Sequence, residues 1–286
     1  MHTTKTGDIQ SANKVADKEG RLYHIGLKKG ELAEFIILVG DQDRPEKAIE
    51  YLSEVTLDTR TREFRTITGK TKSGLDISIM STGIGTDNME IAVVEISQIC
   101  DNPTLIRGGS CGSLQDFINL GDLVISSGSV RIENTSTFFV HEGYPAVAHY
   151  ETIMALSEAA HQNLFDYHIG LTASAAGFYG AQGRAIEGLH VRYPKLSEDL
   201  AKMNVYNFEM ETSALFNLSQ VLKIRSGAVC GVYAHRMKDE FIPVDLKNKT
   251  EKNVLKSAID ACEILYKMDK IKKMTDKKHW MPSLSL

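Results

Sequence analysis

Short apolar runs and amphipathic stretches alternate along the chain from residue 34 onward. Apolar runs of strand length predict β-strands at residues 35–39, 75–81, 104–107, 122–130, 169–173 and 227–233. Helical spacing of apolar positions predicts helices that open at residue 44 and cover residues 88–100, 152–164, 209–222 and 250–268. Strands and helices that alternate with short links are typical of a largely parallel or mixed sheet. We therefore expect a single α/β domain in three layers, with a central mixed β-sheet flanked by helices.

The two ends of the chain differ from this central part. Residues 1–20 are polar and lack the apolar core of a signal peptide, so we expect a flexible N-terminal arm. Residues 21–270 are predicted to form the domain, because no internal repeat and no linker rich in Pro, Gly or Ser divides them. A Lys-rich stretch from Lys267 to Lys278 leads into residues 271–286, for which we favour a solvated C-terminal tail over a weak anionic contact.

Composition and charge narrow the classes of function. Of 286 residues, 42% are hydrophobic and 24% are charged, which is typical of a globular protein with one large domain or two small ones. The net charge of −4 provides no overall basic field, so we expect no nucleic-acid partner. No apolar run reaches the roughly 20 residues that a bilayer span needs, so we expect no membrane partner.

The cysteines and histidines do not indicate a metal site. Four cysteines lie far apart and form no Cys-x-x-Cys pair. We expect them to be buried, reduced thiols, which favours a cytoplasmic location. His141 and His149 are too far apart for the His-Glu-x-x-His spacing of a zinc site.

Glu209, Met210 and Glu211 stand at the start of the stretch that predicts the helix over 209–222. Successive helix residues point about 100° apart, so the two carboxylates cannot share one face by periodicity. A carboxylate here can accept hydrogen bonds from both hydroxyls of a sugar diol, and the flexible Met side chain can pack on the sugar ring. The alternative is a solvated acidic first turn that complements the helix dipole.

Four segments that contain glycine, aromatic or charged residues follow predicted strands. They are Gly40 to Arg44, Gly83 to Gly85, Arg107 to Ser110 and Tyr233 to Arg236. In sheets of this kind the ligand lies beyond the carboxyl ends of the strands. Glycine turns expose backbone N–H groups and guanidinium groups add charge, so together they favour an oxyanion, most of all phosphate. No P-loop and no dinucleotide-binding motif is present, and each turn alone is also compatible with a simple connection.

The segment from Gly177 to Arg184 combines an aromatic pair, an amide and a guanidinium. This set suits a planar heterocycle with a carbonyl–NH–carbonyl edge, because Gln182 can donate and accept while Arg184 donates. The alternative is a surface loop with incidental polar residues.

Several segments occur in an order that resembles the uridine phosphorylase branch of the nucleoside phosphorylase-I family, from residue 22 to residue 265. They are Tyr23-His24-Ile25-Gly26-Leu27, Val39-Gly40-Asp41-Gln42-Asp43-Arg44, Arg62-Glu63-Phe64, Ser81-Thr82-Gly83-Ile84-Gly85, residues 106–112, residues 178–184 and Phe208-Glu209-Met210-Glu211-Thr212. The resemblance implies a pentosyltransferase that cleaves uridine with phosphate, yielding uracil and ribose 1-phosphate in pyrimidine nucleoside salvage. It implies no organic cofactor and inorganic phosphate as the co-substrate.

The resemblance also implies roles for individual residues. The implied phosphate ligands are Gly40, Arg44, Arg62, Arg107 and Ser110, and the implied ribose ligands are His24, Ser110, Met210 and Glu211. The implied base contacts are Gly112, Phe178, Gln182, Arg184, Phe208, Glu209 and Arg236. The implied catalytic residues are Arg107, Arg184 and Glu211, and the implied ligands of a monovalent cation, K⁺, are Glu63, Ile84 and Asn88. Because His24 and Arg62 resemble residues that a neighbouring subunit supplies, the resemblance implies a homo-oligomer with shared active sites, either a dimer or a trimer of dimers.

Electrostatics agrees with this reaction. Cleavage of an N-glycosidic bond builds positive charge on the sugar and negative charge on the departing base. Phosphate and Glu211 suit the first charge, and Arg184 with Gln182 suits the second.

The chain departs from the family pattern in two places. The usual Gly-Thr-Thr/Ser-Gly turn reads Gly109-Ser110-Cys111-Gly112, which keeps a hydroxyl for phosphate. Thr86-Asp87-Asn88 stands where many relatives have a Pro-Ser pair, which weakens the case for the cation.

Three other functions are alternatives to this one. A purine nucleoside phosphorylase of the same family would typically place an Asp near the end of the last strand, where this chain has Tyr233-Ala234-His235-Arg236. A nucleosidase that uses water would lack the arginine cluster. A catalytically silent nucleoside-binding protein would not need the full set of charged residues.

Overall fold

The computed structural model describes residues 2–3 and 6–284. Its strands form one mixed sheet and are β1 (His2–Thr3), β2 (Phe35–Val39), β3 (Leu52–Thr61), β4 (Phe64–Thr71), β5 (Asp76–Ser81), β6 (Thr104–Ser113), β7 (Leu123–Ile132), β8 (Ala146–Val147), β9 (Tyr167–Ala175), β10 (Val205–Glu209), β11 (Arg225–His235) and β12 (Glu240–Phe241). The α-helices are α1 (Arg44–Lys47), α2 (Thr86–Ile99), α3 (Tyr150–Gln162), α4 (Leu196–Lys202), α5 (Thr212–Val221) and α6 (Val244–Thr275). Short 3₁₀ turns cover Ala48–Tyr51, Thr135–Phe138, Gly180–Gln182 and Pro282–Leu284.

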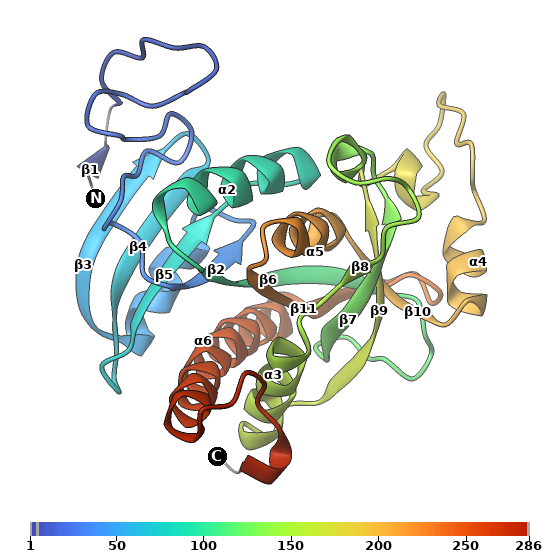
Figure 1. Ribbon diagram of the computed structural model, residues 1–286. Coiled ribbons are helices and arrows are strands. Elements are labelled where there is room, and N and C mark those ends of the chain that lie inside the picture. Colours follow the sequence, from blue (N-terminus) through green and yellow to red (C-terminus); the bar gives the residue numbers. More distant parts are fainter. Residues whose placement is uncertain (1, 4–5, 285–286) are drawn as a thin grey trace.

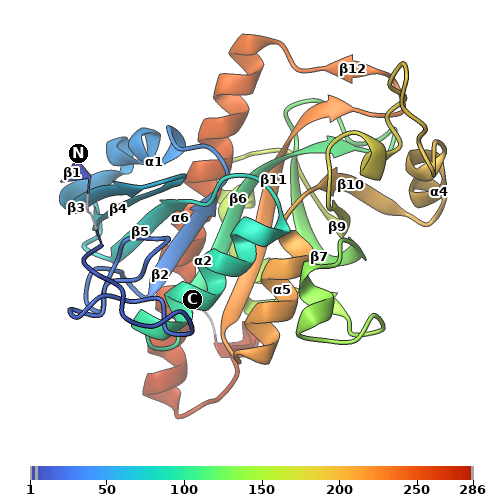
Figure 2. The ribbon, with the colours of Figure 1, turned by 90° about the horizontal axis from the view of Figure 1, so that it is seen from above.

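Five strands of the sheet close on themselves. β6 pairs with β10 and with β11, β11 pairs with β7, β7 pairs with β9, and β9 pairs with β10. These five strands therefore form a ring, and β2, β5, β4 and β3 continue from β6 as an open sheet. Figure 2 shows α6 running behind β6 and β11, where the ring meets the open sheet. Because β6 belongs to both parts, residues on β6 can reach ligands bound at the junction.

The central strands are buried on both faces. In β2, Phe35 and Ile37 pack into an apolar cluster with residues of α3 and α6, whereas Ile36 and Leu38 pack into a second cluster with residues of α2 and α5. This division follows from the alternation of side chains along a strand. Figure 1 shows α2 and α5 above the sheet and α3 and α6 below it. The expected three-layer α/β domain with a mixed sheet is confirmed.

The predicted end of the strand at Arg107 is wrong. The apolar run predicts a strand that ends at Arg107, but β6 continues through residues 108–112 to Ser113. A Cβ atom on Gly108 would lie 3.2 Å from Val254 of α6, and a Cβ atom on Gly109 would lie 2.8 Å from the Arg107 guanidinium. The glycines therefore let the strand pass close to its neighbours, and they do not form a turn.

The predicted start of the helix at Glu209 is also wrong. The helix predicted over 209–222 begins only at Thr212, because Glu209 ends β10 and Glu211 occupies the N-cap position. Asn207 and Phe208 pair with β6, which extends the backbone up to Glu209. Both residues are buried, at 3% exposure each, so the alternative of a solvated acidic turn is wrong.

Other elements differ from the prediction mainly in length. α1 has only four residues, and α6 has 32 instead of the 19 between residues 250 and 268. The hairpin of β3 and β4 was not predicted, because β3 lies largely exposed and its polar residues hide the strand pattern. Neither α6 nor any other helix in the described residues is long and apolar enough to cross a membrane.

The ends of the chain lie on the domain. β1 pairs with β3, and the Asp17 carboxylate accepts hydrogen bonds from the N–H groups of Gly7, Glu19 and Arg21. The flexibility expected for residues 1–20 stays a prediction, and residues 1, 4 and 5 of the arm lie outside the described residues, as do 285–286 of the tail. α6 runs through residue 270, where we expected the tail to begin, and Trp280 beyond it is 5% exposed.

Glu151 of α3 connects this C-terminal segment to the core. Its carboxylate accepts hydrogen bonds from Lys272 Nζ and from the Trp280 N–H, and it forms an ion pair with Arg225 at 2.9 Å. The pKa of Glu151 falls to about 2, because these partners outweigh burial, which alone would raise it. The carboxylate is therefore charged and fully paired at neutral pH.

We expect Glu151→Ala to lower the free energy of unfolding by about 3 kcal/mol, because it removes a buried carboxylate shared by two partly buried cations, which among the described residues keep only Asp269 as a charged partner. The folded-state pKa is depressed, so this contribution is fully present above pH 4.5 and is lost as the pH falls toward 2. Urea unfolding of wild type and variant should show a difference that narrows below pH 4.5. Glu158→Ala on the same helix is the control, because within residues 2–3 and 6–284 the Glu158 carboxylate accepts a hydrogen bond from Gln162 alone. Equal losses for the two variants would contradict the prediction.

Candidate functional site

A cavity of about 430 Å³ opens along β6, beside the ends of β2, β5 and β11. This volume suits a small-molecule ligand. Its lining residues are Gly40, Asp41, Arg44, Gly83, Ile84, Arg107, Ser110, Cys111, Gly112, Phe178, Gln182, Arg184, Phe208, Glu209, Met210, Glu211, Tyr233, Ala234 and Phe241. The cavity therefore brings together the four glycine and charged segments, the acidic motif and the aromatic–amide segment, which lie far apart in the sequence.

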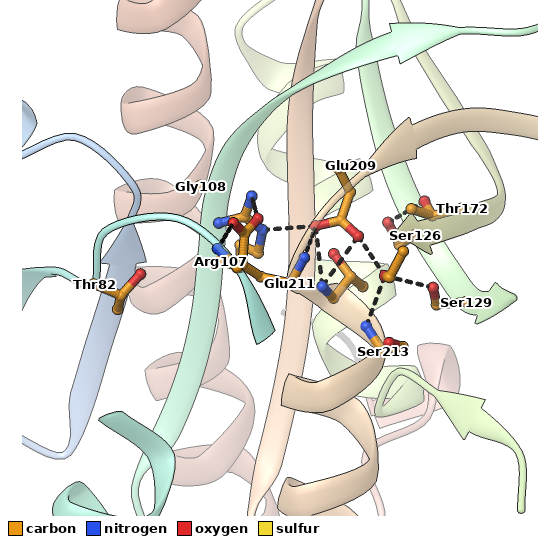
Figure 3. A network of polar contacts seen from close by, with 12 residues as sticks. Thr82, Arg107, Gly108, Ser126, Ser129, Thr172, Glu209, Glu211 and Ser213 are labelled. Atoms are coloured by element: carbon orange, nitrogen blue, oxygen red, sulfur yellow. Dashed lines mark hydrogen bonds and ion pairs between the residues drawn. The ribbon is translucent and has the colours of Figure 1, made fainter. Parts of the chain in front are cut away.

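Arg107 is the centre of the charge arrangement. Its Nε donates to Glu209 Oε2 at 3.0 Å, and its Nη2 donates to Glu211 Oε2. Figure 3 shows the guanidinium facing both carboxylates. Its Nη1 is buried and has no partner among the described residues. Arg107 lines the cavity, and one nitrogen of this buried cation therefore has no hydrogen-bond partner in the described protein.

Burial and charge act in opposite directions on this cluster. Burial alone would lower the pKa of Arg107, but Glu211 and Glu209 outweigh it and raise that pKa. Burial raises the pKa of Glu211, and Arg107 offsets part of the increase. Glu211 also accepts the N–H of Gly85 at 2.6 Å, which ties it to the turn before α2. The cluster holds two carboxylates against one guanidinium, so a further cation or donor near Glu211 is favourable.

Arg44 supplies a second cation from the other side of the cavity. Glu251 of α6 accepts its Nε at 2.8 Å, and the Lys47 Nζ donates to the same carboxylate at 2.6 Å. The Arg44 side chain is 11% exposed, so this ion pair holds it in a defined orientation. Its Nη1 reaches the Gly108 carbonyl at 3.5 Å. Arg44 therefore lies beside the glycine segment of β6, residues 108–112, which directly follows Arg107 in the same strand.

The aromatic–amide segment forms a third part of the cavity. The Arg184 guanidinium lies over the Phe178 ring at 3.7 Å and donates to Gln182 Oε1 at 2.6 Å. Arg236 does not line the cavity but donates to the Gln182 carbonyl at 3.1 Å. Burial, followed by the charge of Arg236, lowers the pKa of Arg184 to about 10. Gln182 is 3% exposed, so its amide is held in a fixed place.

His24 and Arg62 lie outside the cavity of their own chain. His24 Nδ1 lies 2.6 Å from Glu95 Oε1, and Glu95 also accepts the Ile25 N–H. Arg62, in the turn between β3 and β4, has a φ of 54° and donates to the Tyr23 hydroxyl at 2.8 Å. Both side chains are oriented by the protein, and neither lines the cavity of its own chain.

The residues implied for a cation meet at one turn. Glu63 and Asn88 both lie close to Gly83, because a Cβ atom on Gly83 would be 3.3 Å from Glu63 and 2.6 Å from Asn88. The backbone there has a φ of 74°, which favours glycine. Within the described residues no group of three or more His, Cys, Asp or Glu side chains could hold a metal ion.

Some residues of the site were not predicted. Glu251 and Glu95, which orient Arg44 and His24, have no local motif, and only the fold brings them near their partners. Phe241 lines the cavity because β12 pairs with the end of β11. Ile84 was expected only as a cation ligand, but it also lines the cavity as a largely exposed apolar residue.

The comparisons with known proteins agree with this arrangement. The family model described as phosphorylase superfamily matches residues 34–267. The chain belongs to the phosphorylase superfamily. Among curated relatives of this superfamily member, uridine phosphorylase of Thermococcus kodakarensis is 40% identical, with 96% of this chain and 97% of the relative covered. Uridine phosphorylase of Escherichia coli is 34% identical, with 85% and 98% covered.

A solved structure resembles this phosphorylase superfamily member closely. The Trypanosoma brucei nucleoside phosphorylase, described as showing uridine phosphorylase activity, superposes with a TM-score of 0.81 at 27% identity. The superposition covers 85% of this chain and 97% of that chain. The family and fold expected from the sequence are confirmed.

We expect phosphate or sulfate to raise the melting temperature of this phosphorylase superfamily member more than chloride does at matched ionic strength. An anion that binds only the folded state stabilises it by about 2.7 kcal/mol at 100 times its Kd. Arg107→Ala should abolish the phosphate-specific increase in a thermal-shift assay. The control is Arg192→Ala, which removes an exposed arginine outside the cavity. An equal response to chloride and phosphate would mean that the cavity is not an anion site.

Proposed function

We propose that this chain is a uridine phosphorylase, a pentosyltransferase that converts uridine and phosphate into uracil and ribose 1-phosphate in pyrimidine nucleoside salvage. The unpartnered Nη1 of buried Arg107 carries the proposal, because together with the second cation, Arg44, it provides a charged donor for an anion. Membership of the phosphorylase superfamily and the activity named for the relatives support it.

The charge pattern suits the reaction. Phosphate bound between Arg44 and Arg107 would attack the anomeric carbon of the nucleoside, forming a C–O bond as the C–N bond to the base breaks. Gly40 and Ser110 line the same cavity and add a backbone N–H and a hydroxyl. Glu211 would accept hydrogen bonds from the sugar hydroxyls, and Met210 would pack on the ring. No side-chain nucleophile is needed, because positioning and electrostatics lower the barrier.

The departing base carries away the electron pair of the C–N bond. Arg184 and Gln182 would donate to the uracil edge, where negative charge develops. Phe178 and Phe208 would contact the base, and Gly112 leaves room beside Arg236. Donors that are already fixed stabilise this charge without reorganising.

Two further features belong to the proposal. Inorganic phosphate is the co-substrate, no organic cofactor takes part, and a K⁺ ion binds near Glu63, Ile84 and Asn88. The active unit is a homo-oligomer, a dimer or a trimer of dimers, in which His24 and Arg62 serve the site of a neighbouring subunit. Their position outside the cavity of their own chain supports this arrangement.

Purine nucleosides are the second candidate substrate. The residues at the end of β11 argue against them, because the stretch after Tyr233 offers His235 and Arg236 but no Asp before Asp239. The amide and guanidinium of Gln182 and Arg184 match a carbonyl–NH–carbonyl edge better than a purine edge.

We expect uracil release from uridine to require phosphate and to produce ribose 1-phosphate in equal amounts. Phosphorus NMR of the sugar product, with absorbance of released uracil, measures both. Inosine and guanosine tested at the same concentration serve as the comparison. Free ribose formed at a rate independent of phosphate would indicate a hydrolase, and faster cleavage of the purine nucleosides would indicate the alternative.

Shared active sites predict complementation between two inactive variants. Arg62→Ala and Arg107→Ala homo-oligomers should each be strongly impaired. After subunit exchange, a mixed dimer has one site with both arginines intact, so activity should return toward one half of the wild-type value per mixed dimer. Each variant exchanged with itself is the control. Mass spectrometry verifies that the subunits have exchanged. If activity does not recover after that exchange, the shared site is contradicted.

A further inference from the structure

The Glu209 carboxylate is completely occupied by donors from its own chain. It accepts from Arg107 Nε at 3.0 Å, from the Glu211 N–H at 2.8 Å, from the Thr212 N–H at 3.0 Å, and from the Ser174 hydroxyl. Four donors match the roughly four lone-pair positions of a carboxylate. The side chain has 0% exposure. Glu209 therefore has no acceptor left for a nucleobase, although the family resemblance implies a base contact.

Glu209 instead fixes the orientation of Arg107. The guanidinium is planar, so holding its Nε in one direction also sets the directions of Nη1 and Nη2. Nη1 is the nitrogen without a partner, and Nη2 meets Glu211. An error in the position of Glu209 would thus change the direction of the donor that we assign to the anion.

The Ser174 hydroxyl is fully used in holding Glu209. Its oxygen accepts the Ser213 N–H at 2.9 Å, and its proton faces a carboxylate that can only accept. Ser129, 2.8 Å away, must therefore donate to Ser174. These hydrogen bonds form a relay from Ser129 on β7 through Ser174 on β9 to Glu209 on β10. Figure 3 labels its two ends, Ser129 and Glu209.

We propose that Ser174 is a positioning residue of the anion site, acting through Glu209 on Arg107, with Ser129 holding Ser174 in turn. The inference rests on the proposed function in taking phosphate as the anion. Ser174 does not line the cavity, so it acts on the ligand only through the two residues that follow it in the relay.

The same strands contain a second relay that serves as a control. Ser126 of β7 bonds to Thr172 of β9 at 2.6 Å, and Thr172 donates to Asn207 of β10 at 2.9 Å. Thr172 is paired with Asn207 in the sheet register, just as Ser174 is paired with Glu209. Thr172 and Ser174 are two residues apart on β9, so their side chains leave the same face of the strand. The second relay differs in that it ends at the Asn207 amide, with no hydrogen bond to Arg107 among the described residues.

The test compares Ser174→Ala with Ser126→Ala in the full chain. Phosphate affinity is measured by calorimetry with inorganic phosphate, and KM is measured separately for phosphate and for uridine. Loss of a hydrogen bond to a charged group corresponds to about a ten-fold change in equilibrium. We expect Ser174→Ala to raise the Kd and KM for phosphate by about ten-fold, with a much smaller change in the KM for uridine. Ser126→Ala should bind phosphate as wild type does, despite losing a buried hydroxyl.

Ser129→Ala keeps the test decisive if Ser174→Ala does not fold, because it removes only the outer donor. It should weaken phosphate binding in the same direction by a smaller factor. Wild-type phosphate affinity in both relay variants would overturn the inference, as would equal weakening by Ser126→Ala. If the wild type binds phosphate but forms no ribose 1-phosphate, the proposed function fails while the binding comparison still tests the relay.

Discussion

The buried guanidinium of Arg107, held between Glu209 and Glu211, is the interaction on which the rest of the site depends. Charges away from water are stable only when geometry and hydrogen bonding compensate for lost hydration. Here the compensation comes from every neighbouring element. The first N–H groups of α5, the turn before α2 and a hydroxyl of β9 all donate to the two carboxylates. The ring of strands brings these donors to one place.

The constraint explains why β6 contains glycines where a core strand would normally have branched residues. A Cβ atom on Gly109 would collide with the guanidinium that the strand itself presents. Gly112 lies near the end of β6, and a Cβ atom there would lie 3.2 Å from the Arg236 side chain, which follows β11. The glycine segment therefore provides space for two arginine side chains, and pairing with β2, β10 and β11 offsets the weak strand preference of glycine.

Two charged side chains of the site are already held by protein partners, whereas a third, Glu211, can still accept hydrogen bonds from a ligand. Glu209 is fully paired and Arg44 is held by Glu251, so the protein defines both before a ligand arrives. Glu211 bonds to Arg107 and to one backbone N–H, and burial raises its pKa, so it gains most from hydroxyl donors on a ligand. In the proposed reaction an anion at Nη1 would share Arg107 with Glu211, which is bonded to Nη2, so one side chain links the anion and sugar positions. The groups at the other part of the cavity, Gln182 and Arg184, are oriented independently of this cluster.

Much of the fold and the location of the site could be predicted from the sequence. The continuous apolar run of Phe35–Val39 predicts a strand buried on both faces, and the structure confirms it because helices cover both sides. The charged and glycine-rich segments after the strands predict one site, because parallel strands bring their ends to the same edge. What the tertiary structure alone decided is the environment of each group. Glu209 is the end of a strand only because β6 and β9 pair with that segment, and such long-range pairing outweighs the local helical pattern. Glu95, Glu251 and Ser174 have no motif around them, since their effect comes from distances across the fold that local sequence does not encode.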